Sequence, residues 1–333
     1  MDTRWIGPHG IGRLAAEVFA RLPEAEEVPR GVRHLSLLDP VWLSHVIWRR
    51  QPQVYFSPGF NAPAYSVAPF VFTICDLTHL QYATGAIPLK RAYYWWLMRP
   101  ACHRAFRVLT ISEFSRREIV NWAGVSADRV INVSCGVDAS YTREGEKYEP
   151  GFRYLLYVGN RKPHKNLPRL LEAFTAAHID SDIKLILSGD SDPETARQLD
   201  DLQISGRVSF AGNIPEDKMP ALYRGAEALI LVSLIEGFGL PVVEAMACGT
   251  PVVAANATSL PEVAGDAAQF VDPFETRAIA HGIEAVVNDP SRRAWLIVRG
   301  IERARQFSWD ATASRVRAVL RDAAASNSRG ARA

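Results

Sequence analysis

Short apolar runs separated by polar and glycine-containing segments recur along the whole chain. In the C-terminal half, such runs lie at residues 154–158, 183–187, 208–211, 228–233 and 251–255. Runs of this length, bounded by turn residues, are typical of strands buried on both faces of a parallel sheet. Amphipathic helical patterns, such as LPRLLEAFTAA from Leu167 onward, alternate with them. The alternation predicts an α/β fold built on doubly wound parallel sheets.

The N-terminal half carries weaker strand patterns, which lie at residues 32–38, 54–57, 70–75, 108–112 and 130–134. A doubly wound domain should open with an apolar strand, yet MDTRWIGPHGIGR reaches a glycine loop at residues 10–13 almost at once. Either the domain lacks its first strand or the start codon lies upstream. An amphipathic helix is expected after the glycine loop, from about Leu14 to Leu22.

The chain has 333 residues, which is enough for two α/β domains. We expect an N-terminal domain over residues 1–140, a charged linker over residues 141–152 and a second domain over residues 153–310. A helix over residues 311–322 is expected to pack back on the first domain. The tail over residues 323–333 consists mainly of small and polar residues and is expected to be disordered.

The most informative stretch begins at Ala226 and reads AEALILVSLIEGFGLPVVEAMACGTPVVAAN. Its first apolar run predicts a strand. Pro241 then fits the first turn of a short helix over residues 242–248, because its missing N–H would have no partner there. Gly249 ends the helix and a second strand follows. The glycine-flanked loop before the helix therefore lies at the carboxyl end of a parallel strand, where open α/β sheets bind ligands.

Two carboxylates, Glu236 and Glu244, bracket this loop. Carboxylates readily accept hydrogen bonds from hydroxyl groups, but they repel phosphate. The helix start next to them favours an anion. The combination therefore suits a polyhydroxylated ligand that also carries phosphate. The segment EGFGLPVVEAMACGTPVV closely resembles the signature of retaining, nucleotide-sugar-dependent glycosyltransferases of family four, which have the GT-B fold. The resemblance implies two Rossmann-like domains that face each other across a cleft.

The resemblance also implies a role for each residue of the loop. The residue matching Glu236 holds hydroxyls of the donor sugar, and the residue matching Glu244 holds the nucleotide ribose. The sugar and diphosphate meet the backbone of the residues matching Gly237, Phe238, Gly239 and Leu240. In the family, the loops after the strands at residues 183–187 and 208–211 border the nucleobase, which places Gly212 beside the donor.

A cluster of cations follows the strand at residues 154–158, in the segment GNRKPHKN. A strand, a glycine, several cations and a helix start describe a diphosphate clamp. Cations at a helix N-terminus oppose its dipole unless an anion is present, although a solvated charge run is the alternative. The resemblance implies that Arg161 and Lys165 hold the diphosphate, and we take these two with Glu236 as the catalytic residues. No DxD-type carboxylate pair is placed to bind a metal, so neither a metal nor a cofactor is expected.

Candidate residues of the first domain come from two segments. Gly12 belongs to GIGR, which resembles a family loop that lies across the cleft from the donor phosphates. The run VAPFVFTIC ends at Asp76, where the family commonly reads His-Asp-Leu, but here Cys75 occupies the histidine position. Asp76 and His79 are candidates for the acceptor and sugar side, with a surface or packing role as the alternative for His79.

The net charge of +2 gives no bulk electrostatic sign of nucleic-acid binding. The cysteines are widely spaced, as in cytosolic proteins with free thiols, and no apolar run approaches the ~20 residues of a membrane span. We therefore expect a cytoplasmic protein.

Residues 84–107 combine cations with neighbouring Tyr and Trp residues, which suits the inner face of an anionic membrane or a lipid-linked acceptor. A packed aromatic helix face beside a solvated basic face is the alternative.

Together these features predict a retaining, metal-independent hexosyltransferase of surface polysaccharide biosynthesis. It would move a hexose from a nucleotide-diphosphate sugar to a saccharide or lipid-linked acceptor. Mannose from GDP-mannose is the favoured donor, because the family members that look most similar build mannose-containing polysaccharides. The alternatives are a glucosyl or N-acetylglucosaminyl transferase that uses a UDP-sugar, an epimerase or phosphorylase of related fold, and a non-catalytic sugar-nucleotide-binding protein.

Overall fold

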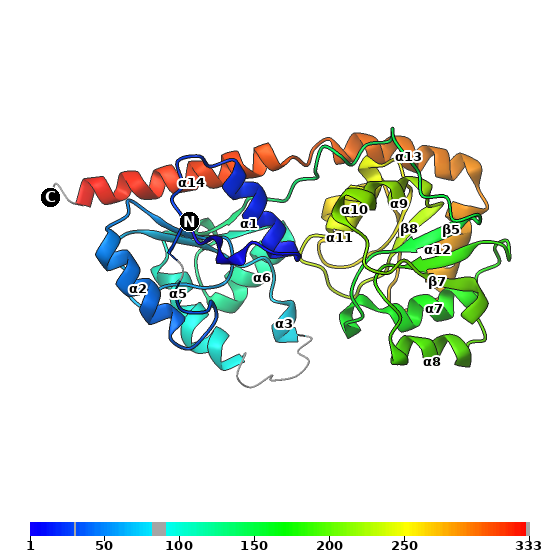
Figure 1. Cartoon of the computed structure of the whole chain (residues 1–333), viewed down its shortest axis with the longest axis horizontal. Helices are drawn as coiled ribbons and strands as arrows, with labels where there is room; N and C mark the ends of the chain where they lie inside the picture. The colour runs from blue at the N-terminus through cyan, green and yellow to red at the C-terminus, as the bar shows by residue number, and fades with distance from the viewer. Residues whose placement is uncertain (30, 82–90, 331–333) are drawn as a thin grey trace. The chain divides into compact units, whose positions relative to one another are not determined.

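The computed structural model describes residues 1–29, 31–81 and 91–330. The chain forms two compact units, shown in Figure 1. Unit 1 consists of Met1–Gly136 together with Ser308–Ala333, and unit 2 consists of Val137–Phe307. The residues of the expected linker, 141–152, belong to unit 2, where Tyr148 N–H donates to the carbonyl of Ala221 (2.9 Å).

Unit 2 is built on a six-stranded parallel sheet in the order β10-β9-β8-β5-β6-β7. Its strands are β5 (Tyr154–Tyr157), β6 (Lys184–Leu187), β7 (Val208–Phe210), β8 (Ala228–Leu231), β9 (Val252–Ala255) and β10 (Gln269–Val271). The first strand along the chain, β5, lies between β6 and β8, so the direction of winding reverses there. This is the doubly wound strand order of a Rossmann fold.

Helices cover both faces of this sheet (Figure 1). They are α7 (Leu167–Ala176), α8 (Pro193–Asp201), α9 (Met219–Gly225), α10 (Leu240–Ala247), α11 (Leu260–Ala264), α12 (Thr276–Val287) and α13 (Pro290–Ala304). Leu170 and Phe174 of α7 and Ile279 and Ile283 of α12 are fully buried, and each pair shares one helix face because its members are four residues apart. Strands β5, β8 and β9 are buried along their whole length, which explains their unbroken apolar runs.

Unit 1 contains a four-stranded parallel sheet in the order β1-β2-β3-β4. Its strands are β1 (Tyr55–Ser57), β2 (Phe70–Thr73), β3 (Arg107–Thr110) and β4 (Val130–Asn132). Its helices are α1 (Gly10–Ala20), α2 (Asp39–Arg50), α3 (Thr78–Gln81), a π-helical turn (Tyr94–Met98), α5 (Arg99–Arg104), α6 (Glu113–Ala123) and α14 (Trp309–Gly330). The chain start lies beside β1, because Asp2 N–H donates to the carbonyl of Phe56 (2.8 Å).

Two local predictions for unit 1 are wrong. Residues 32–38 form turns that lead into α2, not a strand, and Leu37 and Leu38 are 78% and 67% exposed. Their apolar character therefore does not reflect burial in a sheet. The expected glycine loop at residues 10–13 is the first turn of α1, which is capped by the side chain of His9.

The expected disordered tail is also wrong over the part that the structure describes, because α14 continues to Gly330. Ala313, Val316 and Ala323 are buried, and their spacing of three to seven residues places them on one helix face. Arg317 also pairs with Glu24, with 3.0 Å between Nε and Oε1. The three alanines at residues 323–325 are strong helix formers, Ala323 is buried, and Asn327 Nδ2 donates to the carbonyl of Gln53 (3.4 Å).

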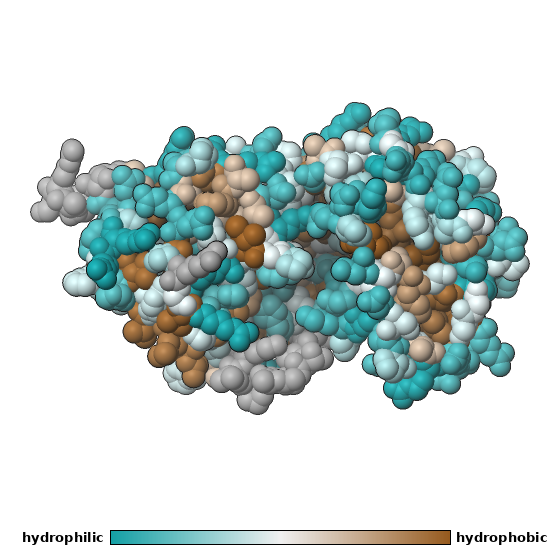
Figure 2. Space-filling view, in the orientation of Figure 1, coloured by the Kyte–Doolittle hydropathy of each residue, from teal (hydrophilic) through white to brown (hydrophobic). Residues whose placement is uncertain are grey.

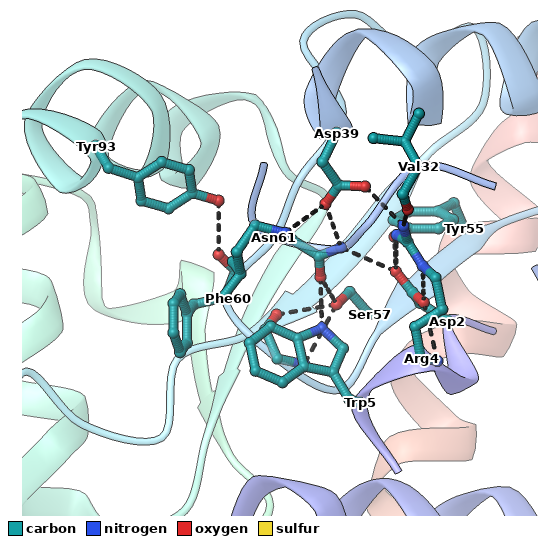
Figure 3. A network of polar contacts seen from close by, with 12 residues as sticks. Asp2, Arg4, Trp5, Val32, Asp39, Tyr55, Ser57, Phe60, Asn61 and Tyr93 are labelled. Atoms are coloured by element: carbon teal, nitrogen blue, oxygen red, sulfur yellow. Dashed lines mark hydrogen bonds and ion pairs between the residues drawn. The ribbon is translucent and has the colours of Figure 1, made fainter. Parts of the chain in front are cut away.

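A buried polar network holds the N-terminal residues against β1 and α2 (Figure 3). Arg4 lies between two carboxylates, with Nη2 2.6 Å from Asp2 Oδ2 and Nη1 2.7 Å from Asp39 Oδ1, and both acids are essentially inaccessible. Asn61 donates to Asp2 (2.8 Å) and Asp39 (3.2 Å), while its own oxygen accepts from Trp5 Nε1 (2.7 Å). Burial alone would raise the pKa of Asp2, but the hydrogen bonds from Arg4 and Asn61 lower it below its ordinary value.

We expect Asp39→Ala to lower the free energy of unfolding of unit 1 by about 3 kcal/mol, because it leaves Arg4 and Asn61 partly unpaired in the interior. Urea unfolding followed by tryptophan fluorescence measures this, since seven of the eight tryptophans belong to unit 1. Asp310→Ala is the matched control: Asp310 pairs with Arg21 but is 86% exposed, so a change within about 1 kcal/mol is expected. Equal effects of the two substitutions would contradict the importance assigned to the buried network.

Candidate functional site

The candidate site of unit 2 lies where the winding of the sheet reverses. Strands β5 and β8 are neighbours, and the segments after them carry the two clusters singled out in the sequence. Residues 159–166 follow β5, and residues 233–239 follow β8. Because parallel strands end at one edge of a sheet, these two loops start side by side, at the position where doubly wound sheets bind ligands.

Backbone and side-chain hydrogen bonds join these two loops. Asn166 is buried in a left-handed conformation (φ 60°), and its Nδ2 donates to the carbonyls of Val232 (3.0 Å) and Pro273 (2.7 Å). The N–H of Leu234 donates to the carbonyl of His164 (2.8 Å). The 3₁₀ turn Pro163–Lys165 is thereby fixed against the segment that follows β8.

An ion pair connects the two loops at their functional side chains. Lys165 Nζ lies 2.7 Å from Glu236 Oε1, and the same oxygen accepts from Ser233 Oγ (2.7 Å). The two charged side chains are only 15% and 12% exposed. Thr258 Oγ1 accepts from the N–H of Glu236 (3.1 Å), which holds the backbone from the side of α11. Of the expected site residues, Lys165 and Glu236 are the pair that the structure brings into direct contact.

The loop from Gly237 to Leu240 connects the segment after β8 to the start of α10. Gly239 is in a left-handed conformation (φ 97°) and caps α10, and a Cβ there would lie 2.5 Å from Leu260 Cδ2. Only glycine fits this position without movement of its neighbours. The ring of Phe238 is buried against Phe307, with centroids 5.6 Å apart, so its side chain serves packing.

Arg161 lies on the opposite side of the β5 loop from Lys165. Its Nη2 donates to the carbonyl of Ser188 (2.8 Å) after β6, and Nη1 donates to the carbonyl of Gly159 (3.2 Å). Its Nε is buried without a hydrogen-bond partner among the described residues, 3.6 Å from Asp192 Oδ2. An acceptor oxygen at this point would complete the hydrogen bonding of the guanidinium.

Contrary to the expectation from the sequence, these cations have anionic partners inside the protein. Glu236 supplies the anion for Lys165 within the protein, and Asp192 lies close to Arg161. The site therefore holds its cations in place before any ligand arrives. A bound diphosphate would compete with these carboxylates for the cations instead of neutralising bare charges.

Glu244 lies apart from Glu236, inside the unit. It is 4% exposed on α10, and its Oε2 accepts from the hydroxyl of Tyr223 (2.7 Å), a fully buried residue of α9. Burial raises the pKa of Tyr223 well above its ordinary value, and the nearby charge of Glu244 adds to this. Tyr223 therefore remains a neutral hydrogen-bond donor that orients the carboxylate.

Gly212 joins the loops after β6 and β7. It is in a left-handed conformation (φ 68°), and it forms an antiparallel bridge with Gly189. The N–H of each glycine donates to the carbonyl of the other, at 3.0 and 3.2 Å. The N–H of Gly212 is thus used within the protein, where it fixes the loop after β7 to the loop after β6.

The other candidates, Gly12, Asp76 and His79, belong to unit 1. The N–H of Gly12 donates to His9 Nδ1 (2.9 Å), and a Cβ on Gly12 would lie 2.2 Å from the carbonyl oxygen of Gly7. Close backbone packing therefore requires a glycine there. Asp76 Oδ1 accepts from the N–H of Thr78 (2.8 Å) at the start of α3.

The position occupied by histidine in the family carries an inert thiol here. Cys75 is buried, and burial raises its pKa well above the ordinary value, with Cys135 and Asp76 adding to the shift. The thiol stays protonated and is a poor nucleophile or base. His79, on α3, hydrogen-bonds to the hydroxyl of Tyr94 (2.6 Å) and packs beside the ring of Phe60.

Within residues 1–29, 31–81 and 91–330, no group of three or more His, Cys, Asp or Glu side chains is arranged to hold a metal ion. In the same ranges, no helix is long and apolar enough to cross a bilayer.

The expected basic aromatic segment falls partly on residues 82–90, which lie outside the described residues. Of its aromatic side chains, Tyr94 is buried, whereas Trp95 and Trp96 are 52% and 74% exposed.

Sequence reasoning missed the residues that orient the site. Ser233 and Thr258 hold Glu236, Asn166 fixes the turn before α7, and Tyr223 holds Glu244. Asn166 carries a weak sequence signal, because an asparagine directly before a helix often adopts a left-handed conformation. Thr258 and Tyr223 carry none, since their partners lie 22 and 21 residues away, and Ser233 lies three residues before Glu236 without a motif that marks the contact.

Two protein families match this chain. The family described as Glycosyl transferases group 1 matches residues 142–303, and the family described as Glycosyltransferase Family 4 matches residues 2–141. An O-antigen chain mannosyltransferase B of Escherichia coli is 36% identical over 300 residues, 85% of this chain and 77% of the relative. A MMP alpha-(1->4)-mannosyltransferase of Mycolicibacterium hassiacum is 31% identical over 248 residues, 72% of this chain and 60% of the relative.

Solved structures of glycosyltransferases show the same fold. The Anabaena protein Alr3699/HepE, solved in complex with UDP-glucose, aligns with a TM-score of 0.74 and 19% identity over 95% of this chain and 97% of its own. WaaG, a glycosyltransferase involved in lipopolysaccharide biosynthesis, aligns with a TM-score of 0.73 and 13% identity over 94% of this chain and 97% of its own. At these identities the likeness concerns the fold, and it confirms the expected fold class.

The Lys165–Glu236 contact predicts a specific pattern of stability. Lys165→Met should lower the free energy of unfolding of unit 2 by about 1–3 kcal/mol, because Glu236 then keeps only Ser233 as a partner for Oε1. Adding Glu236→Gln should recover part of this loss, since the double variant leaves no unpaired charge. Calorimetry on the wild type, both single variants and the double variant measures the coupling. Purely additive effects would show that the contact contributes nothing.

Proposed function

The chain belongs to the group 1, family 4 glycosyltransferases, and we propose that it moves mannose from GDP-mannose to a saccharide or lipid-linked acceptor, with retention of configuration. The observation that carries the proposal is the contact of Lys165 with Glu236 at the winding reversal of unit 2. The mannosyltransferase relative in Escherichia coli, named for the O-antigen chain, favours mannose and a role in polysaccharide biosynthesis.

The proposed step breaks the bond between the anomeric carbon and the diphosphate oxygen, and the bonding electrons go to the diphosphate. An acceptor hydroxyl bonds to the same face of that carbon, and its proton passes to the leaving phosphate oxygen. Fixed positive groups stabilise the charge that develops on the diphosphate. Lys165 supplies this charge together with Arg161, whose buried Nε has no hydrogen-bond partner among the described residues, and the N-terminus of α10 adds oriented N–H groups.

Glu236 orients the sugar in this proposal. Lys165 and Ser233 both contact Oε1, which holds the carboxylate in one position while Oε2 accepts from sugar hydroxyls. Positioning of this kind raises turnover because the reacting atoms are held close to the geometry of the transition state. Glu244, oriented by Tyr223, accepts from the nucleotide ribose. No metal takes part in the proposed step, so turnover should persist in EDTA.

A screen of nucleotide sugars tests the donor. We expect GDP-mannose to raise the melting temperature of the protein most, since a ligand at a hundred times its Kd adds about 2.7 kcal/mol of stability. With an acceptor saccharide present, nuclear magnetic resonance of the product should show an α-linked sugar, the configuration of the donor. If only UDP-glucose or UDP-N-acetylglucosamine stabilises the protein and is transferred, that nucleotide sugar is the donor and GDP-mannose is not. Binding without any transfer would favour the non-catalytic alternative, and release of free sugar from the donor alone would favour an epimerase.

Separate substitutions of the two carboxylates distinguish their roles. Glu236→Ala should reduce turnover sharply while the affinity for GDP, measured by calorimetry, stays near that of the wild type. Glu244→Ala should weaken GDP binding by about 1–3 kcal/mol, the value of one lost charged hydrogen-bond partner. Glu302→Ala, at a surface residue whose side chain is 61% exposed, serves as the control and should change neither quantity. Equal GDP affinity in the Glu236 and Glu244 variants would refute the division of roles.

A further inference from the structure

The segment of unit 1 from residue 31 to residue 107 has an unusual charge balance. It contains eight Lys and Arg residues against two Asp and no Glu, although the whole chain carries a net charge of only +2. Of the two acids, Asp39 is buried and paired with Arg4. The surface contributed by this segment is therefore strongly basic, which favours contact with an anionic partner.

The same segment exposes large apolar side chains. Of the fourteen exposed large hydrophobic residues found in the described part of the chain, nine lie between residues 35 and 96. Leu37, Leu38, Val41 and Trp48 are between 60% and 78% exposed, and the turn spacing from residue 37 to residue 48 places them along the outer side of α2 and its entry. Figure 2 shows apolar side chains gathered on this part of unit 1.

A cavity of about 610 Å³ opens beside this surface. Its lining comes from three parts of the segment: Leu35, Ser36 and Leu37 before α2, Phe60 and His79, and Ala92, Tyr93, Tyr94, Trp96 and Leu97. The volume is in the range of small-molecule sites. Leu37 and Trp96 belong both to the cavity lining and to the exposed apolar residues, so the cavity and the apolar surface are continuous.

The polar atoms of the aromatic lining are used within the protein. His79 Nε2 is hydrogen-bonded to the Tyr94 hydroxyl (2.6 Å), and the Tyr93 hydroxyl donates to the carbonyl of Phe60 (3.2 Å), a contact drawn in Figure 3. Burial raises the pKa of both tyrosines, so they stay neutral. A sugar ring would need several free hydrogen-bonding groups in such a pocket. The lining instead offers mainly hydrocarbon and ring faces.

The buried network around Arg4 holds the walls of this cavity in place. Asp39 Oδ2 accepts from the N–H of Leu35 (3.2 Å) and from Asn61 (3.2 Å), the residue that follows Phe60. Both wall segments therefore depend on the same carboxylate. A preformed cavity of this kind binds without the cost of ordering its walls.

We propose that this cavity receives the hydrocarbon chain of a lipid that carries the acceptor saccharide, presented by an anionic bilayer surface. The inference rests on the proposed transferase function and narrows its acceptor to the lipid-linked class. The chain fills the cavity, while Leu38, Val41 and Trp48 contact the outer part of the bilayer and the surrounding arginines contact anionic headgroups. Among the described residues of this segment, the exposed cations are Arg33, Arg49, Arg50, Arg91 and Arg104.

Acceptors that differ only in the chain test the cavity. The same saccharide is compared as its methyl and its dodecyl glycoside, below the micelle concentration. In the wild type the dodecyl chain should lower KM by at least about tenfold, the gain expected from burying roughly two methylene groups or more. Ala92→Trp, which fills the cavity, should make the KM values of the two glycosides nearly equal but leave kcat/KM for the methyl glycoside unchanged. Ala318→Trp, on an exposed position of α14, is the control and should keep the wild-type difference in KM between the two glycosides.

Binding measurements separate this inference from the proposed function. A dansyl-labelled undecanoate should bind the wild type and lose at least about tenfold affinity in Ala92→Trp and in Leu37→Asp, whose rim position is 78% exposed and tolerates a charge without unfolding. Chain binding without sugar transfer to any acceptor would contradict the proposed function and leave the cavity assignment intact. Transfer with equal KM for both glycosides, or unchanged binding in both variants, would overturn the cavity assignment and leave the transferase function intact.

Flotation with phosphatidylglycerol vesicles tests the surface around the cavity. The wild type should float with the vesicles, and the bound fraction should fall with added salt and in Trp48→Ser, because both headgroup attraction and apolar contact contribute. Phosphatidylcholine vesicles are the neutral comparison and should bind several-fold less. Flotation that ignores salt, lipid charge and the Trp48 substitution would overturn the bilayer part of the proposal.

Discussion

The reversal of winding between β5 and β8 is the constraint on which unit 2 depends. Because the chain winds to opposite sides of the sheet from this point, the loops after two central strands open next to each other instead of being covered by a helix. The Lys165–Glu236 ion pair links these two loops, and both charged side chains are mostly shielded from water. Ser233, Asn166 and Thr258 then hold the pair, so the charged groups keep their geometry without a ligand.

Unit 1 has a smaller sheet, of four strands, and it buries several polar and charged side chains near the chain start. Arg4, Asp2, Asp39 and Asn61 satisfy one another in the interior, which fixes the entry of α2 and the loop after β1. A buried network of this kind is stable only when all its members are present. Its outer neighbours, Leu37 among them, are left exposed and apolar, and we have assigned that surface to a lipid-linked acceptor.

Much of the fold follows from local patterns, and the exceptions have physical causes. Every predicted strand of unit 2 is present, because residues such as Leu155 and Ile230 must be apolar on both faces of a parallel sheet. The strand predicted at residues 32–38 is absent, because Leu37 and Leu38 are apolar but lie exposed at the surface and not in the sheet. The helix beyond Ala323 was missed because this segment of small and polar residues has no apolar periodicity that would indicate a helix.

The sequence alone determined the fold class, the family and the identity of the charged residues, because strand burial, glycine turns and helix starts each impose local residue choices. Only the tertiary structure decided how those residues are paired. Lys165 meets Glu236 across 71 positions, whereas Arg161 turns to Ser188 and Glu244 turns inward to Tyr223. The physical reason is that a side chain's partner depends on strand order and on which loops share an edge of the sheet, and strand order is a property of the whole chain.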